Sequence, residues 1–232
     1  MKIAVFLFLF IFAVITAKTN TMNKNEQFVI AINRELGSGG RTIGKKLAEK
    51  LGVRFYDKAL IRELEKRFHL TVEEIEKLKG QNQSWWAEFG RIMRIGEIDV
   101  YTYEAKMGVE PELITTDDIF KAETEILKGI AETESCVITG RCGFFVFRNH
   151  PNHVNILIQA PMEYRVARVA RKQNMTPEEA RKTIDKIDKM RENYVKKYTK
   201  TSRYDTKNYQ LVISAEGKTE DEIVDLILSY IG

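Results

Sequence analysis

Short, mostly apolar segments recur along the chain, and the stretches between them are long enough to form helices. Strands that are buried on both faces of a parallel sheet have this pattern, whereas a half-buried strand alternates apolar and polar positions. The segments are 28–32, 53–56, 136–139, 154–158 and 211–213. The pattern therefore predicts a sheet of about five strands.

Amphipathic helices are predicted between these strands. Ile43, Leu47 and Leu51 share one face of a helix that begins near Arg41, and Gly52 follows as its C-terminal cap. Further helices are predicted at 58–68, from 72, at 117–133, at 162–174, from 177 and from 220. Such alternation implies an α/β fold, in which helices flank a parallel sheet and every strand ends at the ligand-binding edge.

A glycine-rich turn, Leu36-Gly37-Ser38-Gly39-Gly40, joins the first strand to its helix. Glycine lets backbone N–H groups approach a phosphate closely, and the helix N-terminus adds a partial positive charge. The turn therefore predicts a P-loop NTPase-type sheet that binds ATP. The residues expected at the ATP phosphates are Gly37, Ser38, Gly39, Gly40, Arg41 and Thr42, with the Thr42 hydroxyl also on Mg²⁺.

The turn departs from the usual pattern G-x-x-x-x-G-K-[ST] at both ends. Arg34 stands where the first glycine is expected, and Gly40 stands where the lysine is expected. Arg41, one position later, would supply the missing positive charge and is therefore predicted to be catalytic. The alternative is a tight structural turn that binds no ligand.

Charge and composition narrow the class of partner. The formal net charge of +4 is too small to argue for nucleic-acid binding. Residues 163–203, however, carry 13 Lys or Arg against 6 Asp or Glu, which suits a polyanionic ligand or a solvated helix face. Two cysteines and three histidines exclude a disulfide framework and give no zinc-ligand spacing.

An apolar run, 3–17, precedes the predicted domain, which we place at 22–232. The run is short for a membrane span, which needs ~20 residues. Three interpretations stay open: a signal peptide, a membrane anchor, or a wrongly chosen start with translation beginning at Met22. We expect a cytoplasmic protein, with membrane tethering or export as the alternative if residues 1–21 are a genuine anchor or signal.

Several segments resemble the cytidylate kinase-like family of P-loop nucleoside monophosphate kinases, in which a Gly-Arg pair commonly replaces Gly-Lys in the loop. The similarity runs from about Phe28 to the C-terminus and is weak over 80–115. The segments that carry it are 34–41, 43–48, 55–58, 136–142, 160–165, 188–194 and 208–213. The resemblance implies a helical lid over the sheet edge.

The resemblance also implies roles for individual residues. Asp188 and Arg191, three apart on one helix face, match the Asp-x-x-Arg of the lid and are expected to be catalytic. Gly140 and Arg141 match a second Gly-Arg pair of the family, and Cys142 stands where the family has an aspartate after this pair. The residues expected to bind the acceptor substrate are Asp57, Arg62, Gly140, Arg141 and Arg168.

The expected activity is transfer of a phosphoryl group from ATP to a nucleoside monophosphate, CMP or dCMP, with Mg²⁺ as cofactor. Such transfer needs positioning and neutralised charge and little covalent help, so the lack of a nucleophilic triad is no obstacle. Two alternatives stay open: a P-loop kinase with a different small-molecule acceptor, and a nucleotide-binding module without turnover, which the missing lysine suggests. The expected partners are nucleotides and not nucleic acid, and the sequence does not specify an oligomeric state.

Overall fold

The structure is a computed structural model of the chain, and it describes residues 22–58 and 117–232. Three predictions lie outside these ranges: the apolar leader, the helices predicted at 58–68 (apart from Lys58) and from 72, and the substrate ligand Arg62. Within the described ranges, no helix is long and apolar enough to cross a membrane.

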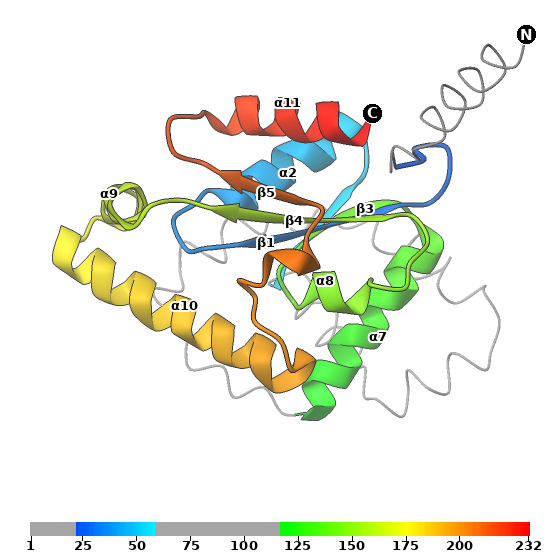
Figure 1. Ribbon diagram of the computed structural model, residues 1–232, viewed down its shortest axis with the longest axis horizontal. Helices are drawn as coiled ribbons and strands as arrows, with labels where there is room; N and C mark the ends of the chain where they lie inside the picture. The colour runs from blue at the N-terminus through cyan, green and yellow to red at the C-terminus, as the bar shows by residue number, and fades with distance from the viewer. Residues whose placement is uncertain (1–21, 59–116) are drawn as a thin grey trace, which may run out of the picture.

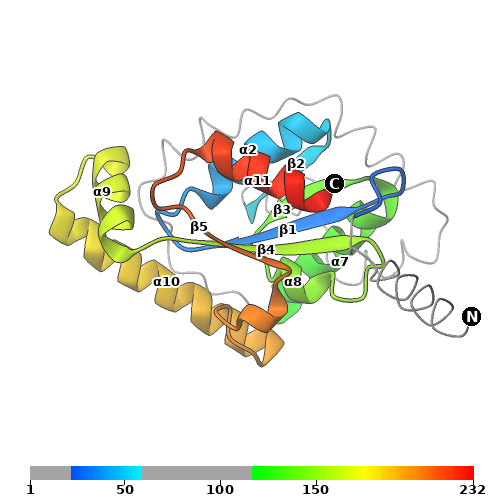
Figure 2. The same ribbon diagram turned by 45° about the horizontal axis from the view of Figure 1, so that its top comes forward.

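The predicted strands pair in one parallel five-stranded sheet with the order β2-β3-β1-β4-β5 (Figures 1 and 2). The prediction of an α/β fold with a parallel sheet is thus confirmed. The strands are β1 (Val29–Arg34), β2 (Arg54–Tyr56), β3 (Cys136–Thr139), β4 (His153–Gln159) and β5 (Leu211–Ser214).

Helices cover both faces of the sheet, as the mostly apolar runs predict (Figures 1 and 2). Successive residues of a strand point to opposite faces. Accordingly, Ile30 and Ile32 pack with α2 (Gly40–Leu51) and α11 (Glu220–Ile231), while Ala31 packs with α7 (Asp117–Thr133) and α8 (Gly143–Val146).

Two further helices, α9 (Met162–Gln173) and α10 (Pro177–Thr199), follow the carboxyl end of β4 (Figure 2). The helix predicted from 177 begins with a capping box, in which the Thr176 and Glu179 side chains each accept a hydrogen bond from the other residue's backbone N–H. A short 3-10 helix, Thr206–Asn208, then leads into β5.

The strand order sets the position of the glycine-rich turn. β1 lies between β3 and β4, so the chain leaves β1 toward one side of the sheet and returns to its other side. This position is a topological switch point, and ligands of open α/β sheets bind there, outside the carboxyl ends of the strands. The turn that follows β1 lies at this position.

Candidate active site

The glycine-rich turn forms a loop that ends at the N-terminus of α2. Gly37 and Gly39 both have φ of +86°, a conformation that side-chain-bearing residues rarely adopt. Gly39 caps α2 without a side-chain hydrogen bond, and the first turn of the helix carries no acid. The first helical hydrogen bond is donated by Ile43 to the Gly39 carbonyl, so the preceding N–H groups face out of the helix end. An anion is favoured there.

Helix α9 packs directly on this loop. A Cβ on Gly37 would lie 2.9 Å from both the Cβ and the carbonyl oxygen of Arg165, so no side chain fits. A Cβ on Gly39 would lie 3.3 Å from Nη2 of Arg168. The Arg168 guanidinium, which also pairs with Glu220 at the start of α11, therefore lies against the predicted ATP-phosphate loop. This arginine, predicted to bind the acceptor, thus lies at the loop predicted to bind ATP.

Other predicted loop ligands are used within the protein. The buried Ser38 hydroxyl donates to the Glu35 carbonyl, at 3.0 Å. Arg41 Nε donates to the buried Asp57 carboxylate, at 2.7 Å, which ties the first turn of α2 to the end of β2. Thr42 is half-buried in that same turn. Arg41 and Asp57, predicted for the two different substrates, thus contact each other.

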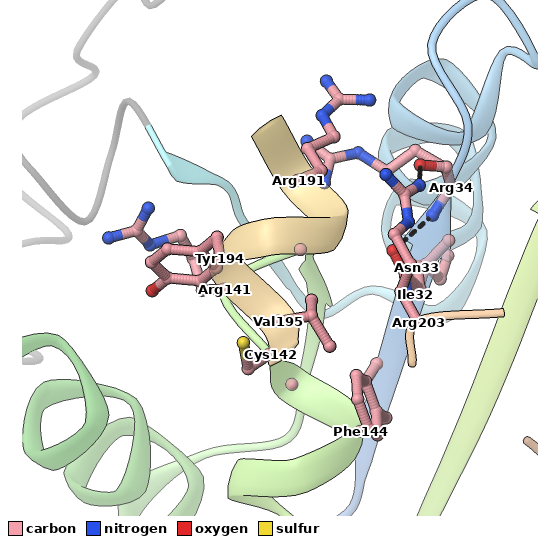
Figure 3. Close-up of a pocket in the computed structure, with 13 residues that line it drawn as sticks. Ile32, Asn33, Arg34, Arg141, Cys142, Phe144, Arg191, Tyr194, Val195 and Arg203 are labelled. Atoms are coloured by element: carbon pink, nitrogen blue, oxygen red, sulfur yellow. Dashed lines mark hydrogen bonds between the residues drawn. The ribbon is translucent and has the colours of Figure 1, made fainter. Parts of the chain in front are cut away.

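A small cleft opens between the carboxyl ends of β1 and β3 (Figure 3). Its polar lining includes four arginines, Arg34, Arg141, Arg191 and Arg203, and none of the described residues that line it is an acid. Figure 3 shows Arg34, Arg191 and Arg203 on one side of the cleft and Arg141 with Tyr194 on the other. The apolar lining includes Ile32, Phe144 and Val195.

Asp188 lies beside this cleft and connects α10 to the phosphate loop. Its carboxylate accepts hydrogen bonds from Leu36 N–H, at 3.0 Å, and from Nη1 of Arg165, at 2.6 Å. Nη1 of Arg203 lies at 3.4 Å and Nη1 of Arg191 at 3.7 Å. Asp188 and Arg191 were expected to act together, but the shorter contacts of Asp188 are to Arg165 and the loop.

Arg203 is a site residue that the sequence analysis missed. Its side chain is fully buried and donates to the Arg34 carbonyl at the end of β1, while its backbone N–H donates to Glu192. Its own carbonyl accepts from the Tyr209 hydroxyl, which in turn accepts from the Asn33 amide. Burial raises the pKa of Tyr209 to about 12, so the hydroxyl stays protonated as the donor. The only sequence signal of Arg203 was its place in the basic segment 163–203.

Arg141 is held on the far side of the cleft. Its buried guanidinium pairs with the buried Glu123 carboxylate and lies 5.3 Å from the ring centre of Tyr194. Gly140, Arg141 and Cys142 all have positive φ, of 80°, 51° and 54°, which makes the tight turn after β3. Burial raises the pKa of the Cys142 thiol to about 12. The thiol is therefore neutral and does not replace the charge of the aspartate that the family has there.

A dedicated metal cage is not evident in the described part of the chain, which holds no group of three or more His, Cys, Asp or Glu side chains placed for a metal ion. Mg²⁺ in phosphotransferases is held mainly by substrate phosphates, waters and one or two protein oxygens. The hydroxyl of Thr42, in the first turn of α2, fits that mode of binding.

Three features define the fold class as that of a P-loop phosphotransferase. They are the parallel sheet, the glycine-rich loop that ends at a helix N-terminus, and the arginine-lined cleft at the topological switch point. The model of the cytidylate kinase-like family matches residues 29–216, so the chain belongs to this family. The resemblance found in the sequence is thereby confirmed. Membership of this family supports a nucleotide kinase, a class of enzyme for which ATP is the phosphoryl donor and Mg²⁺ the usual metal.

Individual relatives agree with this assignment. A cytidylate kinase of Methanopyrus kandleri is 26% identical over 212 residues, covering 88% of this chain and 92% of the relative. A cytidylate kinase of Sulfolobus acidocaldarius is 23% identical over 203 residues, covering 87% and 93%. Among solved structures, an uncharacterized protein from Eubacterium ventriosum superposes with a TM-score of 0.65 at 25% identity, covering 88% of this chain and 98% of that one.

Proposed function

We propose that the protein transfers the γ-phosphoryl group of ATP to the phosphate of a nucleoside monophosphate, CMP or dCMP. The observation that carries the proposal is the meeting of two anion-binding features at the end of β1. The phosphate loop lies on one side of this point, and the cleft lined by four arginines lies on the other. Both features suit phosphate groups, one from each substrate.

The lining of the cleft favours a phosphate acceptor over a hydroxyl acceptor. A hydroxyl must lose its proton during transfer, which calls for a carboxylate base nearby. The described residues that line the cleft include no Asp or Glu, and the two carboxylates beside it, Asp188 and Glu123, are already paired with arginines. A nucleoside monophosphate needs no base, because its phosphate oxygens are already anionic, and guanidiniums hold such oxygens in bidentate pairs.

The residues of the chain then divide the work. The N–H groups at the start of α2 hold the β- and γ-phosphates, and Arg168 lies beside the loop. Arg191 lines the cleft and neutralises charge on the transferring group. Mg²⁺, when bound, draws electron density from the phosphate oxygens, and Thr42 is the residue that would hold it.

Cytidine as the acceptor base is supported by the relatives in Methanopyrus and Sulfolobus, both of which are named cytidylate kinases. The neutral Cys142 argues for a test against other bases, because an aspartate at this place belongs to the acceptor side in the family.

A panel of acceptors tests the proposal. The protein is assayed for ADP formation with ATP, Mg²⁺ and each of CMP, UMP, AMP and GMP, and with cytidine as the matched acceptor that lacks the phosphate. We expect the highest kcat/KM with CMP and no turnover with cytidine. Turnover with cytidine equal to that with CMP would contradict a phosphate acceptor, and preference for another monophosphate would contradict the assignment of the base.

A further inference from the structure

In the phosphate loop, the basic residue and the glycine of the usual pattern have exchanged places between positions 34 and 40. The common P-loop pattern has glycine at the first of these positions and lysine at the second. This chain has arginine first and glycine second. The loop therefore carries a cation at its start, before the glycines, instead of at its end.

The geometry shows why the two changes occur together. A Cβ built on Gly40 would lie 2.5 Å from Cβ and 3.1 Å from Cγ of Arg34, closer than non-bonded carbon atoms approach. Lysine at 40 and arginine at 34 thus exclude each other in this backbone. A Cβ on Gly140, at the end of β3, would likewise overlap the Arg34 guanidinium. Two glycines, one on each flank, leave the space that the Arg34 side chain fills.

The Arg34 side chain is directed into the cleft. Its backbone is fixed at the end of β1, where Arg203 donates to its carbonyl and its N–H donates to Asn33 Oδ1, at 2.9 Å. From there the side chain reaches the Gly140 turn and lines the cleft with Arg191 (Figure 3). This is the boundary between the phosphate loop and the proposed acceptor site.

We propose that Arg34 supplies the phosphate-binding positive charge that lysine supplies in the usual P-loop. The inference rests on the proposed phosphoryl transfer and names the residue that contacts the transferring group from the loop. Arg41, the substitute expected from the sequence, is directed instead to Asp57 at the end of β2. On this proposal the cation comes from the first residue of the loop and not from the residue after its last glycine.

A charge-exchange experiment tests this inference. Four proteins are compared: wild type, Arg34→Gly, Gly40→Lys, and the double variant Arg34→Gly/Gly40→Lys, which restores the first glycine and the lysine of the usual pattern. Arg34→Gly is expected to lower kcat by at least ~100-fold, because one positively charged donor to the transferring group is lost. The double variant should recover most of that loss. Gly40→Lys alone should melt lower than wild type, because the new side chain meets Arg34.

Arg34→Gln and Arg148→Gly serve as controls. Arg34→Gln keeps the loop backbone and should reproduce the kcat loss of Arg34→Gly, even if the glycine variant folds poorly. Arg148 is exposed in the turn after α8, and its change to glycine should leave kcat as in wild type. Melting curves of all variants separate folding from chemistry.

The ratio of the Kd values for ATP and ADP, measured by calorimetry, separates this inference from the proposed function. If wild type phosphorylates no monophosphate, the proposed function fails, yet Arg34→Gln should still lose the preference for ATP over ADP. The inference is overturned if Arg34→Gln retains the wild-type ratio and kcat. It is equally overturned if a folded double variant is no more active than Arg34→Gly.

Discussion

Replacing Arg191 by alanine is expected to lower kcat about 10³-fold, the scale of an arginine that stabilises a transferring phosphoryl group. Arg191 lines the cleft from α10, and its side chain is 29% exposed, so its removal should not unfold the protein. Because the charge it neutralises develops during transfer, the Kd for ATP should change far less than kcat. Steady-state kinetics with CMP and calorimetry with ATP measure the two effects.

Arg181 provides the matched control for this variant. It lies on the same helix but is exposed and pairs with Glu163 at the start of α9. Exposed pairs of this kind contribute under about 1 kcal/mol, so Arg181→Ala should keep both kcat and ATP affinity. A kcat for Arg191→Ala within a few-fold of the control would remove Arg191 from the catalytic residues.

Replacing Asp188 by alanine is expected to cost stability as well as activity. The change leaves the guanidiniums of Arg165 and Arg203, which are 8% and 0% exposed, without their shared carboxylate. Removing one partner of a buried ion pair costs about 3–5 kcal/mol of unfolding free energy. For a chain of this size that loss lowers Tm by roughly 6–20 °C. Thermal unfolding followed by circular dichroism measures the shift.

Two further variants show whether the loss of stability in Asp188→Ala comes from the buried carboxylate charge. Asp185, one turn earlier on α10, is exposed, so Asp185→Ala should melt close to wild type. Asp188→Asn keeps an oxygen for the Leu36 N–H and loses the charge, so its Tm should fall between those of wild type and Asp188→Ala. If Asp188→Ala has the same Tm as Asp185→Ala, the Asp188 carboxylate does not connect helices α9 and α10 to the phosphate loop as the geometry indicates.

The elements of the fold could be predicted because local patterns determine them. The apolar run at 154–158 indicated a strand buried on both faces, and β4 is that strand. Thr176 and Thr219, each with glutamate three residues later, indicated helix starts that the structure confirms as capping boxes. A resemblance of motifs then supplied the fold class, which a list of strands and helices alone would not have done.

The arrangement of the arginines could not be predicted in the same way. Glu123 pairs with Arg141, and Arg203 donates to the end of β1, across separations in the sequence that no periodicity encodes. The sequence does not distinguish the basic residues of segment 163–203 from one another, yet some are buried at the site and others face solvent. The packing of α10 and the segment after it against the ends of β1 and β3 decides which of them reach the cleft.

The central claim is that a phosphoryl group passes from the phosphate loop to a phosphate bound in the arginine-lined cleft. The most direct test follows that group, with ATP labelled in its γ-phosphate, Mg²⁺ and unlabelled CMP. The account predicts that the label appears in the β-phosphate of CDP, at a rate equal to that of ADP formation. Label found only in inorganic phosphate, or retained in ATP while both nucleotides bind, would contradict it.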